Sequence, residues 1–255
     1  MSSDKFVIDL RKQFPNLNKA PIAEAAVQVR VTPASNWNPI ELKVILSKVL
    51  PEYPKVEDLR QMRYEIKAGG AEESNKAENL GCVGLRMFSA DGKYICQFNF
   101  DSFLLSRLPP YKDWPQFTDE ILKLLKLYFE LLKPQKTLRI GLRFINRMIF
   151  NPEKEKVEIF LNDASQSLKP WGLVPEKFFY QNLYKIPGME YNVSLTKAIQ
   201  GVDATKEELI FDIDVFRPLD LACNTDNIRK YLDEMRYIKN EVFFANILNP
   251  VERFK

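Results

Sequence analysis

The chain has 255 residues, of which 45% are hydrophobic and 28% are charged, and its formal net charge is +3. These values are typical of a globular protein with one large domain or two small ones, and the charge by itself does not imply nucleic acid. Histidine is absent, which excludes Ser-His-Asp and Cys-His catalysis, histidine-ligated metals and histidine general bases.

The cysteines and the amino-terminal residues indicate a compartment. Cys82, Cys96 and Cys223 are far apart and form no CxxC pair, so we expect reduced thiols and neither a disulfide framework nor a zinc site. The opening residues lack the apolar core of a signal peptide, and the most apolar helical stretch, ILKLLKLYFELL, is too short and too charged to span a bilayer. We therefore expect a cytoplasmic protein with no membrane segment.

The elements predicted in the first half follow from hydrophobic periodicity. Strands are predicted where apolar and polar residues alternate, and helices where an apolar stripe lies between a capping residue and a proline. Gly69-Gly70 and the polar run to Asn79 predict a hairpin loop. In chain order, the first half contains a strand at 20–33, a short helix at 40–50, strands at 60–69, 81–88 and 94–103, and a long helix at 113–134. Asp113 would cap the long helix and Pro134 would end it.

The central segment, TLRIGLRFINRMIF at 137–150, is the most informative stretch of the sequence. Its even positions are apolar with the one exception of Asn146, and they hold Leu138, Ile140, Leu142, Phe144, Met148 and Phe150. Its arginines, Arg139, Arg143 and Arg147, all occupy odd positions. A period of two favours a strand with an apolar face and an arginine-bearing face over a helix.

The second half repeats the order of the first. The strand at 137–150 is followed by a candidate short helix at 155–168, strands at 177–187, 190–199 and 208–216, and a long helix that Thr225-Asp226 would cap. The repetition predicts a degenerate internal duplication with its seam near 133–136. We therefore divide the chain into an arm at 1–20 and two halves, 21–134 and 135–255, that share one core.

This order predicts an α+β fold. Strands joined by short turns pair antiparallel, and an antiparallel sheet can hide one face under helices while the other stays wet. We expect a curved sheet covered on one face by the two long helices, a topology analogous to helix-grip folds and to the saddle of the TATA-binding-protein fold. Such an analogy carries no function by itself.

The open face of this sheet is the predicted binding surface. It would carry arginines, which suit phosphate or carboxylate, interspersed with carboxylates. Two interpretations remain open: a face that binds an anion or nucleic acid, and a ladder of cross-strand ion pairs in which Asp212 and Asp214 neutralise the arginines. The candidate binding residues are Arg30, Arg63, Lys67, Arg86, Arg139, Arg143 and Arg147.

Two further kinds of site are considered. Asp212 and Asp214 share one face of a strand, and with Asp101 they could hold Mg²⁺ for nuclease or phosphodiesterase chemistry. This pattern is common by chance, and structural ion pairs are the favoured interpretation of the same residues. A small ligand could also lie between helix and sheet, in a cavity lined by Tyr64, Phe98 or Phe144.

Three segments resemble a sporadically distributed bacterial family of uncharacterised proteins of about the same length as this chain. The segment FPNLNKAPIAEAAVQVRV, with Pro21 and Glu24, resembles the opening of that family, and LDEMRYIKNEVFFANIL resembles its final helix. Leu142, Arg143, Phe144, Asn146 and Arg147 match its central motif, Leu-Arg-Phe/Tyr-x-Asn-Arg. The patchy distribution of the family implies a role in a phage-defence or mobile-element system.

Our functional hypothesis is a non-enzymatic binding subunit of a larger assembly. It would engage a partner protein or nucleic acid through the arginine-bearing face or an edge of the sheet, without a cofactor. The alternative is the metal-dependent nuclease or phosphodiesterase that would use Asp101, Asp212 and Asp214.

Overall fold

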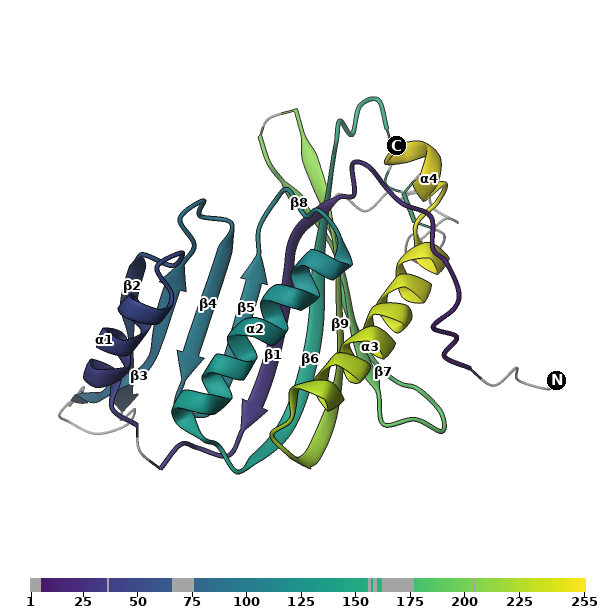
Figure 1. Ribbon diagram of the computed structural model, residues 1–255. Coiled ribbons are helices and arrows are strands. Elements are labelled where there is room, and N and C mark those ends of the chain that lie inside the picture. Colours follow the sequence, from purple (N-terminus) through teal and green to yellow (C-terminus); the bar gives the residue numbers. More distant parts are fainter. Residues whose placement is uncertain are drawn as a thin grey trace.

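The described part of the chain has an α+β structure, seen here in a computed structural model. It comprises residues 6–35, 37–65, 76–155, 157, 160–161, 177–203 and 205–255, with the backbone alone described at 63–65, 76–78 and 80. Within these residues, nine strands form one antiparallel sheet, with helices beside it (Figure 1). The predicted α+β class and the antiparallel pairing are therefore confirmed.

The elements fall into two runs, each ending in a long helix. The first run is β1 (Ile22–Val31), α1 (Pro39–Val49), β2 (Lys55–Glu65), β3 (Lys76–Phe88), β4 (Tyr94–Asn99), β5 (Ser102–Arg107) and α2 (Trp114–Leu132). The second run is β6 (Lys136–Phe150), β7 (Phe179–Lys185), β8 (Asn192–Gly201), β9 (Glu207–Ala222) and α3 (Thr225–Asn246), followed by the short α4 (Pro250–Arg253).

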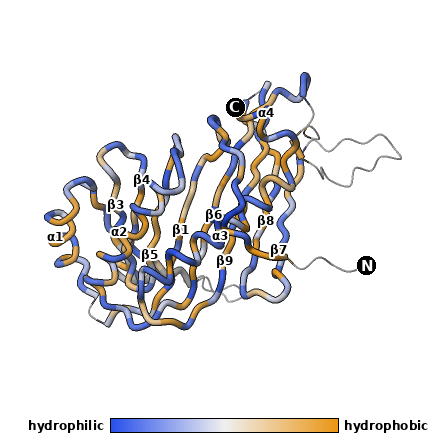
Figure 2. The backbone as a smooth tube through the Cα atoms, turned by 45° about the vertical axis from the view of Figure 1, so that its right-hand side comes forward, coloured by the Kyte–Doolittle hydropathy of each residue, from blue (hydrophilic) through white to orange (hydrophobic). Residues whose placement is uncertain are grey.

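The sheet is built outward from a central pair of strands. Its order is β2-β3-β4-β5-β1-β6-β9-β8-β7, so β1 and β6 lie side by side in the middle and β2 and β7 form the edges. Val27 of β1 is opposite Leu142 of β6, and both side chains are fully buried. Figure 2 shows hydrophobic residues along these central strands. This long-range pairing joins the two runs of elements into one sheet.

The long helices pack on the sheet and on each other. In Figure 1 both lie in front of the sheet, with α2 in contact with β5 and α3 in contact with β6 and β9. Their buried side chains, such as Leu124 of α2 and Leu232 of α3, belong to the same hydrophobic core as the buried residues of the strands. On the sheet surface turned away from these helices, which we call the open face, the described side chains of Arg143 and Arg147 are exposed.

β6 confirms the strand predicted at 137–150. Ile140, Leu142 and Phe144 are buried, whereas Arg143 is exposed, as alternation requires. Leu138 departs from the expected apolar face, since it is 40% exposed. A register irregularity between Thr137 and Arg139 shifts the alternation, so that Thr137 points inward and Leu138 outward.

The helix boundaries follow local capping chemistry. The Asp113 carboxylate accepts a hydrogen bond from the backbone N–H of Gln116 at 2.8 Å, as predicted for α2, and Pro134 follows the helix. Asn38 caps α1 in the same way. At α3 the sequence-based expectation was wrong by one residue, because Asn224, one residue before the expected Thr225-Asp226, supplies the capping oxygen.

Other predicted elements are corrected by the structure. The single strand expected at 94–103 is two strands, β4 and β5, joined by a tight turn at Phe100-Asp101. The loop expected to run to Asn79 ends earlier, because β3 begins at Lys76. Gly69-Gly70 and most of the candidate short helix at 155–168 lie outside the described residues.

Candidate functional site

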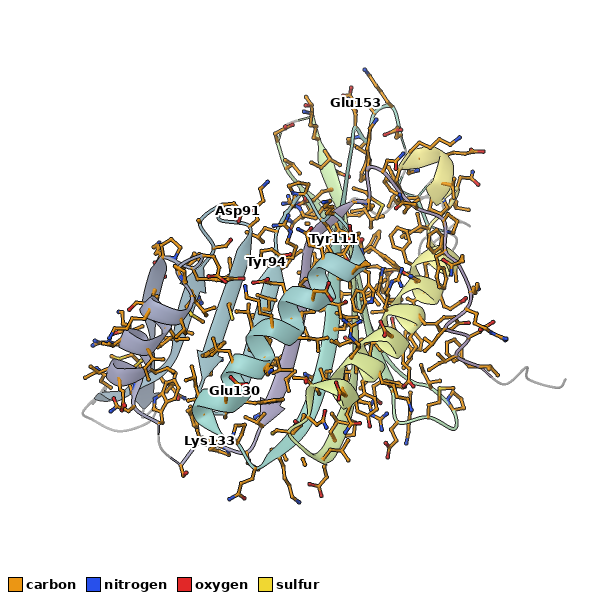
Figure 3. The ribbon with its side chains drawn as sticks, viewed as in Figure 1. Asp91, Tyr94, Tyr111, Glu130, Lys133 and Glu153 are labelled. Atoms are coloured by element: carbon orange, nitrogen blue, oxygen red, sulfur yellow. The ribbon has the colours of Figure 1, made fainter. Side chains whose placement is uncertain are left out.

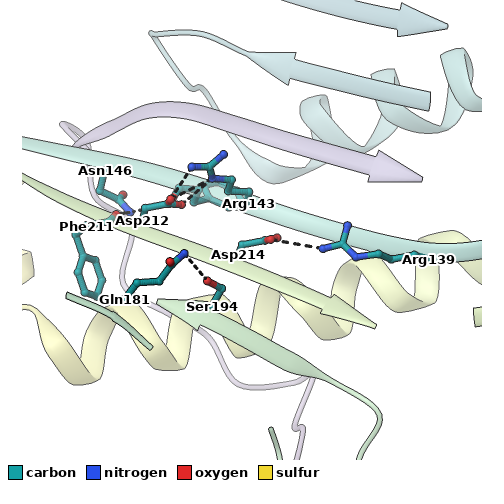
Figure 4. A network of polar contacts seen from close by, with 9 residues as sticks. Arg139, Arg143, Asn146, Gln181, Ser194, Phe211, Asp212 and Asp214 are labelled. Carbon is teal, nitrogen blue, oxygen red and sulfur yellow. Dashed lines mark hydrogen bonds and ion pairs between the residues drawn. The ribbon is translucent and has the colours of Figure 1, made fainter. Parts of the chain in front are cut away.

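The three arginines of β6 form a ladder with carboxylates of the neighbouring strand β9. Figure 4 shows two of these pairs, Arg139 with Asp214 and Arg143 with Asp212. The Nε and Nη2 atoms of Arg143 donate to the two carboxylate oxygens of Asp212 at 2.7–3.1 Å. Arg139 lies 3.6 Å from Asp214, and Arg147 pairs with Glu208. The geometry along β6 therefore agrees with the cross-strand ion-pair interpretation of the open face.

Burial makes the carboxylates the more constrained partners of these pairs. The side chains of Asp212 and Glu208 are 13% and 2% exposed, against 50% and 48% for Arg143 and Arg147. The hydrogen bond to Asp212 raises the pKa of Arg143, and burial raises the pKa of Asp214 despite the neighbouring arginines. Each guanidinium thus lies beside a carboxylate that is more buried than or as buried as itself, and little net positive field is left along β6.

Arg139 has additional partners that hold it against the sheet. Its Nη1 donates to the side-chain oxygen of Gln28 on β1 at 3.0 Å, and its guanidinium lies 4.5 Å from the ring centroid of Phe216. A guanidinium held by an amide, a carboxylate and an aromatic face has few donors left for an incoming anion.

The remaining predicted cations are dispersed. Arg30 of β1 lies 3.9 Å from Asp101, and both are partly exposed. Arg86 is on β3, three strands from β1, and its Nε is buried without a hydrogen-bond partner among the described residues. Arg63 lies in the last part of β2, residues 63–65, for which the backbone alone is described. Lys67 lies outside the described residues. The open face therefore brings together only part of the predicted cationic set.

The carboxylates considered for a metal are separated by the sheet. Asp212 and Asp214 are on β9, whereas Asp101 is in the turn between β4 and β5, with β1 and β6 in between. At about 4.8 Å per strand, the two groups are on the order of 14 Å apart. Within the described residues, no group of three or more His, Cys, Asp or Glu side chains is arranged to hold a metal ion. The geometry thus gives the nuclease alternative no support.

The β7 edge of the sheet is unusually apolar for an exposed strand. All seven residues of β7 are exposed. Phe179 and Leu183 are 69% and 68% exposed, and Tyr180 and Tyr184 are 46% and 50% exposed. β7 pairs with β8 on one side only, and no other described strand pairs with its outer side. We refer to Phe179, Tyr180, Leu183 and Tyr184, with the outer backbone of β7, as the β7 edge.

A cleft also lies between the helices and the sheet, where the third sequence-based possibility placed a small ligand. Phe144 is in its wall, whereas Phe98 is fully buried in the core and the Tyr64 side chain is not described. Sequence reasoning missed the cations of this cleft, which are Lys112, Arg236 and Lys239. Lys239 lies seven residues after Leu232 and four after Met235, on the apolar stripe of α3, and this position was the available signal.

No protein-family model matches this chain, and no curated protein matches it in sequence. No helix in the described part of the chain combines the length and the apolar character needed to cross a membrane. Parts of all three segments that carry the family resemblance line the cleft between helices and sheet, among them Pro21, Asn146 and Arg236.

Proposed function

We propose that this protein is a non-catalytic binding subunit that engages an extended segment of a partner protein through the β7 edge. The observation that carries this proposal is the β7 edge itself, where large apolar side chains and unpaired backbone groups are exposed together. A strand of a partner would pair with the free N–H and C=O groups, and its side chains would cover Phe179 and Leu183 on one face and the two tyrosines on the other. Exposed apolar edges that are left uncovered promote aggregation, so a natural edge of this kind favours a partner.

The strand pairing supports this division of the faces. Leu183 is opposite Ser194 and Phe179 is opposite Ala198, whereas Tyr184 is opposite the buried Val193. Phe179 and Leu183 therefore extend the open face, and Tyr180 and Tyr184 extend the face on which the helices pack. A partner strand would bury apolar surface on both sides of the sheet at once, which is worth about 25 cal/mol for each Å² removed from water.

Nucleic acid is the less favoured partner. A phosphate-binding face needs cations free to replace counterions, and the arginines of β6 are each paired with a carboxylate. The charge balance of +3 adds little long-range attraction.

The test is recovery of the native partner with tagged protein. Leu183→Lys places a charge on the β7 edge and should abolish recovery of a partner that wild-type protein retains. Ile40→Lys is the matched control, because Ile40 is 79% exposed on α1, far along the chain from β7, and the same substitution there should leave recovery unchanged. Circular dichroism checks that both variants fold.

Other outcomes of this experiment identify other occupants. A dimer that dissociates with Leu183→Lys in light scattering would identify the partner strand as β7 of a second copy. Equal recovery by wild-type protein and Leu183→Lys would contradict the proposal. Salt-sensitive recovery of DNA or RNA that is lost with Arg143→Ala and Arg147→Ala would favour the arginine-bearing face instead.

We also infer that the two runs of elements are a degenerate duplication with the two long helices on one face. In support, β1, β5, β4 and β3 follow one another outward from the centre of the sheet on one side, and β6, β9, β8 and β7 do so on the other. A long helix follows β5 and β9 alike. An experimental structure in which the two sets do not superpose about a twofold axis would contradict this inference.

The family resemblance adds the biological setting to the proposal. We propose that the assembly belongs to a phage-defence or mobile-element system. A plaque assay on cells that carry the native system should show protection lost when the gene is deleted and when it carries Leu183→Lys, and retained with Ile40→Lys. Equal plaque numbers with and without the gene would contradict this setting.

A further inference from the structure

A cleft of about 260 Å³ opens beside the first turn of α2, between that helix, α3, β6 and the amino-terminal arm. Its floor includes Phe144 and Asn146 of β6, and Tyr111 lies near the start of α2 at its rim (Figure 3). The arm, which follows α3 in Figure 1, closes the outer side, where Phe14 stacks on Phe244 with ring centroids 5.6 Å apart. The cleft is therefore a formed cavity with walls from four parts of the chain.

The cleft contains an excess of positive charge. Lys112, Arg236 and Lys239 line it, with Asp113 as the one carboxylate among the described lining residues. The Asp113 carboxylate already accepts the backbone N–H of Gln116 at the start of α2. Among the described residues, no carboxylate lies within ion-pair distance of Lys112, Arg236 or Lys239. This differs from the open face, where each arginine of β6 has its own acidic partner.

Lys239 is held in an apolar setting. Its ammonium lies 4.2 Å from the ring centroid of Phe144, and burial, assisted by the nearby Arg236, lowers its pKa to about 7. A cation–π contact compensates only part of the cost of removing an ammonium from water. An anion beside Lys239 would supply the missing compensation.

Amide side chains lie beside the cations in the cleft. The Asn146 amide nitrogen donates to the backbone carbonyl of Phe211 at 2.9 Å, which fixes the orientation of this buried side chain. Asn240, one residue after Lys239, also lines the cleft, and its amide is not among the fully buried side-chain groups that lack a hydrogen-bond partner. An amide that is accessible from a cationic cleft can donate to a bound anion.

The walls of the cleft are aromatic. Tyr111 packs edge-on against Phe144 with ring centroids 5.6 Å apart, and the Arg236 guanidinium lies 5.6 Å from the ring centroid of Trp114. Phe14, Phe243 and Phe244 also line the cleft. Apolar walls with a few convergent polar groups are typical of small-molecule sites, and flat walls favour a flat ligand.

We propose that this cleft is a binding site for a small organic anion, in which a carboxylate or phosphate group is attached to a flat apolar body. The anionic group pairs with Lys239 and Arg236 and accepts from the Asn240 amide. The apolar body lies between the aromatic walls. This site is independent of the β7 edge, because no residue of β7 lines the cleft.

Calorimetric titration of the full-length chain with a matched set of probes tests the site. Phenyl phosphate and benzoate carry both features, inorganic phosphate lacks the ring, and phenol lacks the charge. We expect one of the two complete probes to bind at least about 10-fold more tightly than inorganic phosphate and phenol. The complete probe that binds more tightly distinguishes a phosphate ligand from a carboxylate ligand.

Variants locate the binding. Lys239→Met should weaken the tighter probe about 10- to 100-fold, the range expected for a charge-assisted hydrogen bond in a desolvated site. Arg236→Met should also weaken binding of the tighter probe. Because Arg236 is exposed, this second variant should fold, and it tests the site even if Lys239→Met fails to fold. Lys230→Met is the matched control, because Lys230 is an exposed lysine of the same helix outside the cleft, and it should leave binding unchanged.

Three results would overturn the proposal. The first is that neither complete probe binds to the wild-type chain at millimolar concentration. The second is that inorganic phosphate or phenol binds as tightly as the tighter complete probe, which would leave no role for the aromatic walls or for the cations. The third is that Arg236→Met and a folded Lys239→Met both bind like wild type, which would place the binding elsewhere.

Discussion

At the residue scale, the Arg143–Asp212 pair shows how charge is managed on the open face. Arg143→Met should lower the free energy of unfolding by about 1–3 kcal/mol, because it leaves the Asp212 carboxylate, whose side chain is 13% exposed, without its partner. Arg30→Met is the control and should cost about 0–1 kcal/mol, since Arg30 and Asp101 are 3.9 Å apart and both partly exposed. Urea unfolding followed by circular dichroism measures both values, and equal losses would contradict this account.

Lys239 gives a second residue-scale prediction, on pH. Its pKa falls from 10.5 to about 7 on folding, so between these values the unfolded chain binds more protons and this lysine's contribution to stability rises with pH. Lys239→Met should therefore raise Tm most near or below pH 7, by about 2–4 °C for each kcal/mol relieved, and least near pH 10.

The neighbouring charged groups define the control for this pH experiment. Arg236 on the same helix and Lys112 and Asp113 before α2 line the same cleft, whereas the β6 residues that line it are uncharged. These groups are present in wild type and variant alike, so the difference in Tm between the two chains reports on Lys239. A difference that stays constant from pH 6 to pH 10 would contradict the assignment. Lys230→Met should show no pH-dependent difference.

At the element scale, α2 depends on its amino-terminal cap. Asp113→Ala should lower the free energy of unfolding by about 0.5–2 kcal/mol, because the backbone N–H of Gln116 loses its acceptor. Lys112→Ala is the matched control, since Lys112 is exposed, precedes the cap and makes no hydrogen bond to the helix, and it should be nearly neutral. Thermal unfolding by calorimetry separates the two. Equal effects would mean that the cap does not stabilise α2.

At the scale of the whole molecule, the central β1–β6 pairing makes the two halves interdependent. Leu142→Ala in β6 should cost about 2–5 kcal/mol, because Leu142 is fully buried where the halves meet, and unfolding should remain a single transition. Leu138→Ala in the same strand, at a 40% exposed position, should cost far less. Urea unfolding followed both by circular dichroism and by tryptophan fluorescence should give one midpoint, and two separate midpoints would contradict a shared core.

The sequence by itself determined the periodic features of this protein. Alternation in the segment around Gly141 identified β6 as a strand with arginines on its open face, and Asp113 with Pro134 bounded α2, because side-chain period and capping are local properties. It also predicted the antiparallel α+β class, since consecutive strands with short turns leave few other pairings.

Only the tertiary structure decided which groups meet. The pairing of Arg143 with Asp212, the separation of Asp101 from Asp212 and the exposure of the β7 edge all depend on the order of strands across the sheet. In the sequence, Lys239 is a single charged residue on an apolar stripe. Its contact with Phe144 depends on how α3 packs against the sheet. Strand order and helix docking arise from contacts between residues far apart in the chain, and local periodicity contains no information about those contacts.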